Sequence, residues 1–316
     1  MQAALDEAIT ALPKQTEISN AQARIEEALA AAAKGNTVLA EAIFAEVEAR
    51  KVAEGKAARK SAYKEAAEAA RHRGALAFLH DTDKAIAAYR RATELDPEHA
   101  AGWNQLGHLL QRVGDLDEAT AAYRKVEALG KAENNQEFLA IAYGNSGLVY
   151  QTRGELDQAE AMYRKALAIN EELGHKEGMA IQYGNLGIVY RIRGDLDQAE
   201  AMYQKSLAIE EKLGRKESMA IQYGNLGVLY QTRGELDQAE AMYRKSLAIE
   251  EALGRKEGMA SDYGNLGNVY RIRGDLDQAE AMYRKSLGLF QTVGARPRVE
   301  KTQGLLEQLS SLRSGR

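Results

Sequence analysis

Hydrophobic residues recur with helical spacing through most of the chain. One such face has its members at i, i+3, i+4 and i+7, namely Tyr183, Leu186, Gly187 and Tyr190. A second helical pattern begins at Leu196 and ends near Gly214, after an interruption at Gly194. The spacing therefore predicts a hairpin of two helices, called helix A and helix B below.

The interruptions between these helices carry turn residues. We expect Gly194 and Gly214 to adopt positive φ, because glycine reaches that region without steric cost. Asp195 or Asp197 is placed to cap the start of helix B, since a short carboxylate can accept from a free helix N–H. Gly187 is expected where the two helices approach most closely.

The hairpin is repeated along the chain with a period of 40 residues. The string YGN(S/L)G begins at Tyr143, Tyr183, Tyr223 and Tyr263, and LDQAEAMY begins at Leu156, Leu196, Leu236 and Leu276. The turn sequence also alternates, with QTRGE at Gln151 and Gln231 and RIRGD at Arg191 and Arg271. The alternation gives an 80-residue super-period, as duplication of a two-repeat unit or deliberate construction would produce.

These residues resemble the tetratricopeptide repeat (TPR). Its pattern of aromatic, Leu-Gly, Tyr, Ala, aromatic and Ser is matched by Tyr183, Leu186, Gly187, Tyr190, Ala199, Tyr203 and Ser206. Upstream copies have the standard 34-residue period, because 119−85 = 34 separates Ala85 from Ala119. The later copies are similar to the 40-residue variety of Partner-of-Inscuteable adaptors and kinesin light chains. The resemblance implies an all-α fold, a right-handed superhelical α-solenoid of helix-turn-helix repeats.

Three regions are expected along this solenoid. Residues 1–63 form a helical region with a possible degenerate repeat, marked by Gly35, Ala40 and Phe44. Residues 64–293 hold six clear repeats. Residues 294–316 supply a capping helix and a polar tail, because Leu305, Leu309 and their neighbours give only one apolar face.

Composition narrows the function classes. The 316 residues are 45% hydrophobic and 28% charged, which is typical of a folded chain. A net charge of −4 disfavours a nucleic-acid binder, and the absence of cysteine excludes disulfides and thiolate chemistry. The N-terminus lacks the pattern of a signal peptide, and no stretch reaches the roughly 20 apolar residues of a membrane span. We expect a cytoplasmic protein without a membrane contact.

The side of helix A opposite the tyrosines is the candidate binding surface. An asparagine recurs there, and an Asn amide can pair with both polar groups of a ligand peptide unit. The family resemblance implies the same role, because superhelical members hold extended ligands with asparagines at this position. The alternative is that the asparagines bond to one another within the stack. The candidate residues are Asn145, Asn185, Asn225, Asn265, Asn268, Ile181, Ile188, Ile221 and Val228.

The turn residues suggest the charge of the ligand. Arg191 and Arg271, which alternate with Gln151 and Gln231, lie about one turn beyond the asparagines and suit an acidic peptide. A second set of arginines, at 153, 193, 233 and 273, either adds to this charge or pairs with acids at the start of the next helix B. Ile181, Ile188 and Ile192 either form pockets for a ligand or pack between adjacent helices A, and packing is the favoured interpretation.

No catalytic or metal-binding motif accompanies these residues. The five histidines show no HExxH or paired i, i+4 spacing, so no metal or other cofactor is expected. We expect a non-enzymatic adaptor that binds an extended, acidic protein segment. The alternatives are the sensor part of a larger bacterial signalling protein, or a consensus-like scaffold without a specific ligand. Self-association through the terminal repeats or the N-terminal helices is a further alternative.

Overall fold

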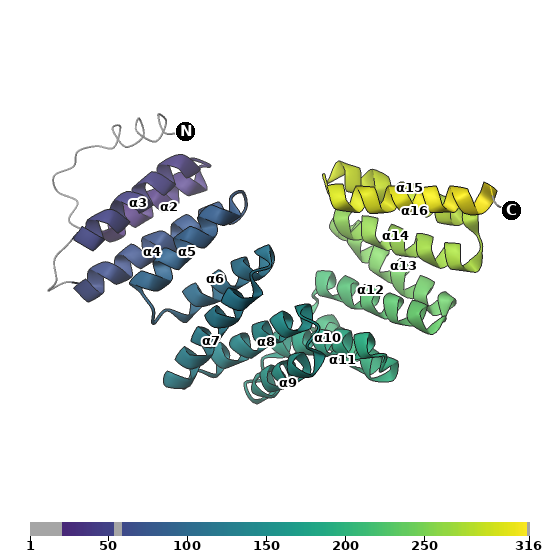
Figure 1. Ribbon diagram of the computed structural model, residues 1–316, viewed down its shortest axis with the longest axis horizontal. Coiled ribbons are helices and arrows are strands. Elements are labelled where there is room, and N and C mark those ends of the chain that lie inside the picture. The colour runs from purple at the N-terminus through teal and green to yellow at the C-terminus, as the bar shows by residue number, and fades with distance from the viewer. Residues whose placement is uncertain (1–20, 54–58, 315–316) are drawn as a thin grey trace. The chain divides into compact units, whose positions relative to one another are not determined.

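The computed structural model describes residues 21–53 and 59–314. These residues form fifteen helices and no strand (Figure 1), which confirms the all-α class. The chain divides into two compact units, 1–149 and 150–316. The helices are α2 (Ala21–Ala33), α3 (Thr37–Ala53), α4 (Arg59–Ala77), α5 (Thr82–Leu95), α6 (Ala100–Val113), α7 (Leu116–Ala132), α8 (Gln136–Thr152), α9 (Leu156–Glu172), α10 (Lys176–Arg193), α11 (Leu196–Leu213), α12 (Lys216–Arg233), α13 (Leu236–Leu253), α14 (Lys256–Arg273), α15 (Leu276–Thr292) and α16 (Arg296–Ser314).

The first unit is a succession of helices from α2 into α8, in which neighbours along the chain pack together from α2 to α7. Its first core joins α2 to α3 through Ile25, Ile43 and Phe44. Ala40 and Phe44, which suggested a degenerate repeat, are both buried, and Gly35 has φ +79 in the turn before α3. The three-region division of the chain stays a prediction, because the boundary between the units falls inside α8.

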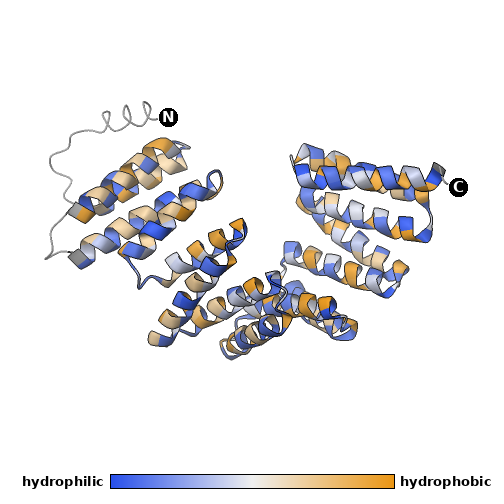
Figure 2. Cartoon of the chain, viewed as in Figure 1, coloured by the Kyte–Doolittle hydropathy of each residue, from blue (hydrophilic) through white to orange (hydrophobic). Residues whose placement is uncertain are grey.

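The second unit repeats one hairpin, with α10, α12 and α14 as helices A and α9, α11, α13 and α15 as helices B. Figure 2 shows hydrophobic and hydrophilic positions interspersed along these helices. Leu186 and Tyr190 of α10 are buried against the hairpin, as expected, and Tyr203 of α11 is fully buried. A Cβ at Gly187 would lie 2.5 Å from Cε1 of Tyr203, so this glycine is required for the close approach.

The turns between the helices agree with the sequence in their glycines and differ in their caps. Gly194 and Gly214 have φ +88 and +67, as expected. Asp195 stands at the N-cap of α11, but its side chain makes no capping hydrogen bond. Asp197 instead pairs with Arg233 from the following repeat, so the capping prediction is wrong for both residues. At the equivalent position of α15, Asp275 does cap its helix, because its side chain accepts from the N–H of Gln278.

Helix α16 follows the last hairpin and packs on α15 with Leu309 buried. It stands at the position of a helix A. Glu307 stands 40 residues after Gly267, and a Cβ at Gly267 would lie 2.6 Å from the Tyr283 ring. Helix α16 therefore lacks the glycine that makes this close contact in α14. Association through this end of the chain stays a prediction.

Among the described residues, none of the helices is long and apolar enough to cross a membrane.

Candidate interaction surface

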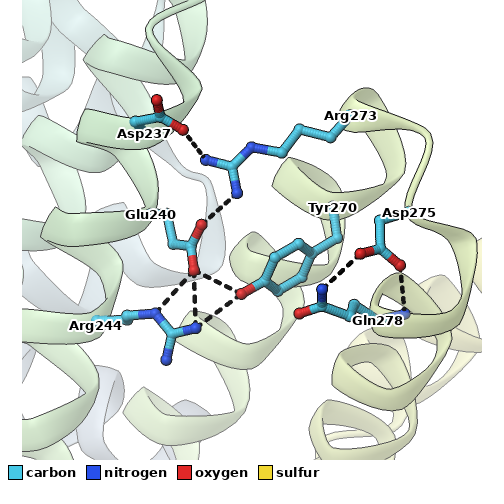
Figure 3. Close-up of polar contacts among 7 residues, drawn as sticks. All are labelled: Asp237, Glu240, Arg244, Tyr270, Arg273, Asp275 and Gln278. Atoms are coloured by element: carbon cyan, nitrogen blue, oxygen red, sulfur yellow. Dashed lines mark hydrogen bonds and ion pairs between the residues drawn. The ribbon is translucent and has the colours of Figure 1, made fainter.

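A charge cluster joins each repeat of the second unit to the next. In Figure 3, Arg273 at the end of α14 reaches Asp237 and Glu240 in the first turns of α13. Glu240 Oε1 also accepts from the Tyr270 hydroxyl at 2.6 Å and from Arg244 Nε at 2.9 Å. One carboxylate therefore connects three donors from two consecutive repeats.

The same cluster recurs with one informative change. Burial alone would raise the pKa of Glu240, but hydrogen bonds from Tyr270, Arg273 and Arg244 overcome it and lower the pKa to about 2. Glu160 is held in the same way, with its pKa also lowered to about 2. At Glu200 the i+4 arginine is replaced by Gln204, which donates to it at 3.0 Å. The pKa of Glu200 is lowered by the remaining donors, Tyr230 and Arg233.

These clusters decide the role of the second arginine set. Arg193, Arg233 and Arg273 of this set each pair with an aspartate and a glutamate of the preceding helix B, whereas the alternative considered from the sequence was the next helix B. The end of helix A places the guanidinium beside the preceding repeat. The sequence of a single repeat does not indicate this direction, because it depends on how consecutive repeats stack. Their charge is satisfied within the fold, so they do not serve a ligand. The arginines are Arg193, Arg233, Arg273 and, from α16, Arg313.

The alternating residues two positions earlier lie beside the buried tyrosine of helix B. Gln151 Oε1 accepts from the Tyr163 hydroxyl at 2.9 Å, and Gln231 Oε1 accepts from the Tyr243 hydroxyl at 3.1 Å. An arginine cannot accept a hydrogen bond, so the repeats with arginine differ in their polar pairing. In the glutamine repeats, the buried tyrosine hydroxyl therefore has its hydrogen-bond acceptor within the fold.

Arg191 and Arg271 remain without an ion pair to any described residue. Arg191 lies beside the hydroxyl of Tyr203: burial raises the pKa of this phenol, and the guanidinium opposes the shift. The Tyr203 hydroxyl is buried and makes no hydrogen bond of good geometry. Tyr283 donates to Asn268 Oδ1 at 2.7 Å and also lies within hydrogen-bonding reach of the Arg271 guanidinium, while the buried Arg271 Nε has no partner.

The asparagine column is not uniform. In the first unit, Asn145 Nδ2 donates to Asn104 Oδ1 at 2.7 Å, which is the alternative considered from the sequence. Asn225 Nδ2 makes a long bond of 3.4 Å to Gln222 within its own helix. Asn185 and Asn265 are half-buried, and their amides bond to no described side chain. Only these last two amides are free for a ligand.

The isoleucines are more exposed than the sequence analysis expected. Ile181 and Ile192 are 46% and 51% exposed, and Ile221 and Ile272 are 51% and 49% exposed. About half of the Ile181 and Ile192 side chains is thus accessible to a ligand, and the choice between packing and a ligand pocket stays a prediction. Ile188 and Val228 are half-buried, so packing holds for them in part. Below, the helix-A surface means the side of α10, α12 and α14 that carries Ile181, Asn185 and Arg191 and their equivalents.

Sequence reasoning missed one buried acid near this surface. Asp262 of α14 is buried where two sibling repeats have Gln182 and Gln222. Burial raises its pKa to about 7, although Ser246 hydrogen-bonds to the carboxylate. The replacement of the repeated glutamine by aspartate at this position was the sequence signal that could have identified it.

The described residues contain no group of three or more His, Cys, Asp and Glu side chains that could hold a metal ion. The polar chemistry of the helix-A surface thus consists of amides, two guanidinium groups and a buried phenol.

A chain of helix hairpins with these close glycine–tyrosine contacts defines a class of helical repeat scaffolds. The tetratricopeptide repeat family model matches residues 98–172, 138–212, 178–252 and 217–292, and a second TPR model matches 80–114. Because the matches cover more than half of the chain, the protein belongs to the tetratricopeptide repeat family. Repeats of this family generally mediate protein–protein interactions, and the family scaffold is generally non-enzymatic.

Solved structures share the solenoid fold. BtubC (BKLC) from P. vanneervenii is 26% identical, with a TM-score of 0.57 over 71% of this chain and 92% of its own. The apo form of RapI is 16% identical, with a TM-score of 0.65 over 89% of this chain and 99% of its own. A tetratricopeptide repeat protein from Parabacteroides merdae is 18% identical, with a TM-score of 0.62 over 90% and 98%. No sequence among the curated proteins matches the chain.

Proposed function

We propose that this protein is a scaffold that binds an extended, acidic segment of a partner protein along the helix-A surface of its second unit. The observation that carries the proposal is the unpaired state of Arg191 and Arg271. The other repeated arginines of this unit, such as Arg193 and Arg215, have carboxylate partners within the fold. A guanidinium left unpaired on an interaction surface favours a carboxylate supplied from outside.

The apolar part of the surface supports the same function. Ile181 and Ile221 lie at equivalent positions of α10 and α12, and each is about half exposed. Exposed apolar side chains arranged in a row, with charged residues beside them, are typical of a protein interaction site. The ligand would place alternate apolar side chains on these isoleucines.

The free amides of Asn185 and Asn265 would hold the ligand backbone. Each amide offers a donor and an acceptor, which match the C=O and N–H of one peptide unit irrespective of the ligand side chain. The isoleucines and arginines then add selectivity for apolar and acidic side chains.

The structure sharpens the choice of variants for a test. We would select a library of 16-residue peptides against the protein and measure the affinity of the selected peptides for Asn185→Ala/Asn265→Ala. Loss of both amides removes four hydrogen bonds and is expected to weaken binding about 30- to 1,000-fold, since each bond contributes about 0.5–1 kcal/mol.

Asn225→Ala is the matched control, because the Asn225 amide already bonds within its own helix. It is expected to change the affinity less than threefold. Circular dichroism verifies equal helicity for all variants. The proposal fails if the selected peptides are not acidic, or if they bind the double variant as tightly as the parent.

A further inference from the structure

We infer that the helix-A surface recognises a spacing: two carboxylates of the ligand, five or six residues apart, bind at Arg191 and Arg271, with an uncharged ligand position between them. This inference rests on the proposed function and adds the register of the partner. It follows from the difference between the two kinds of repeat, which alternate along the second unit.

The glutamine repeats are closed to an anion. The Tyr243 hydroxyl donates to Gln231 Oε1, so the buried phenol and the amide oxygen satisfy each other. Tyr163 and Gln151 form the same pair, and so do Tyr123 and Gln111 in the first unit. None of these pairs carries a charge. A carboxylate placed there would gain no charged partner and would face the lone pairs of the amide oxygen.

The arginine repeat at Arg191 is open to an anion. The buried Tyr203 hydroxyl has no acceptor, and the group next to it is a guanidinium that offers only donors. The phenol oxygen is the neighbour of the guanidinium within the fold, and it carries no charge. Arg191 is half-buried and has no ion pair, so its other N–H groups are the donors that an ionised carboxylate of the ligand, which is acceptor-only, can receive.

The arginine repeat at Arg271 offers the same guanidinium, but the hydroxyl of its neighbouring tyrosine already has an acceptor. Tyr283 already donates to Asn268, while the buried Arg271 Nε has no partner. The second carboxylate therefore binds the guanidinium alone. We expect Arg191 to contribute more to the affinity than Arg271.

Each arginine is followed by an exposed isoleucine, Ile192 or Ile272, whereas the glutamine repeat between them has Thr232. An arginine–isoleucine pair thus alternates with a glutamine–threonine pair from one repeat to the next. A ligand that satisfies both carries an acidic residue next to an apolar residue at each of the two sites. An uncharged polar residue suits the repeat between them.

The spacing of the two sites follows from the repeat. Helices A of consecutive repeats contact each other in the second unit, and packed helices lie roughly 8–10 Å apart. Two such steps separate Arg191 from Arg271, which gives about 16–20 Å. An extended peptide advances about 3.3 Å per residue, so this span corresponds to five or six residues.

The test uses synthetic, fluorescein-labelled 14-residue peptides and fluorescence anisotropy. One peptide has two Glu-Leu pairs six residues apart, one has them five apart, and a third of identical composition has them three apart. The peptides with pairs five or six residues apart are called wide, and the peptide with pairs three apart is called narrow. The tighter-binding wide peptide is expected to bind at least tenfold more tightly than the narrow peptide.

The chain provides its own matched variants. Arg191→Gln installs the residue that the sibling repeats carry beside the same tyrosine, and so it should fold normally. It is expected to weaken binding of the wide peptide by about 10- to 100-fold, the value of a charge-assisted contact. Gln231→Arg creates a third site and is expected to tighten binding of the narrow peptide.

The outcomes separate the two proposals. If all acidic peptides bind equally and Arg191→Gln weakens them equally, the spacing is wrong although the acidic surface remains. If Arg191→Gln has no effect on any peptide, the carboxylate site is wrong. If none of the peptides binds, while library peptides of another composition bind and depend on Asn185, both the spacing and the acidic character are wrong.

Discussion

The first helices and the later repeats are held together in different ways. Glu48 of α3 is buried and bonds Arg73 of α4 at 2.8 Å and Arg91 of α5 at 3.2 Å, an arrangement that occurs once. The later repeats use one cluster, represented by Glu240 with Arg273, at every junction. The junction at Glu48 depends on one residue for its stability, whereas the later junctions share theirs among equivalent clusters. These equivalent clusters can be mutated one at a time and compared with one another.

The largest expected effect is at the unique junction. Glu48→Ala removes the acid that joins three helices and leaves two arginines without this partner. We expect the free energy of unfolding of the first unit to fall by about 3 kcal/mol, as measured by urea denaturation. Glu26→Ala, at an exposed acid of α2, is the control and should cost less than about 1 kcal/mol. An equal, small effect of both variants would contradict the account of this junction.

The next effect depends on pH and concerns Asp262. Its folded pKa, about 7, lies above the unfolded value because burial favours the neutral form. The associated stability is therefore complete at acidic pH below the unfolded pKa and is lost as the pH rises through about 7. Asp262→Gln, which restores the sibling residue, should stabilise the second unit at pH 9 by on the order of 2 kcal/mol.

The same Asp262→Gln variant should change stability little at pH 4. Urea denaturation at both pH values provides the measurement. The groups facing Asp262 include Ser246, which hydrogen-bonds to it, and Glu250, which raises its pKa further. A pH-independent difference between the variant and the parent would show that Asp262 is not the titrating group.

A smaller difference is expected among the repeated clusters. Glu240→Gln loses two arginine contacts, whereas Glu200→Gln loses one, because Gln204 stands where the other repeats have arginine. We expect losses of about 2 and about 1 kcal/mol at pH 7. Both losses should disappear towards pH 2, since the lowered pKa of Glu240 means that its stabilisation is lost as the pH falls through about 2. Equal losses for the two variants would remove the role assigned to Arg244.

The smallest effect on stability is expected on the helix-A surface. Ile181→Ser introduces the residue that stands at the equivalent position 261, and the side chain it replaces is half exposed. Thermal unfolding should shift by less than about 0.5 kcal/mol in stability, while peptide affinity should fall about threefold to tenfold. A large loss of stability would indicate that Ile181 belongs to the core.

The helix hairpins and their turns were predictable from the sequence because each signal is local. Gly194 and its equivalents end a helix in any context, and the 40-residue period repeats the signal. The contacts between repeats were not predictable in the same way. Arg193 turns back to Glu160 of the preceding hairpin, and this direction is set by the stacking of one repeat on another.

Burial was also harder to read than periodicity. Tyr183 shares a helical face with Leu186 and was expected to be buried, yet it is half-buried, with its hydroxyl on Glu171 and Lys205 over its ring. The fully buried ring belongs to Tyr203 of helix B. An aromatic residue at a repeated position therefore indicates that the ring packs against a neighbour, but it does not indicate how much of the ring is buried. Free and bonded asparagines, such as Asn185 and Asn145, have the same sequence context and differ only in their neighbours.

The central claim is that Arg191 and Arg271 are kept unpaired for a carboxylate of a partner. The most direct measurement is the dissociation constant of the wide Glu-Leu peptide for the parent and for Arg191→Gln/Arg271→Gln. Our account predicts at least a 100-fold weaker affinity for the double variant, with unchanged helicity and thermal stability. An unchanged dissociation constant would contradict it.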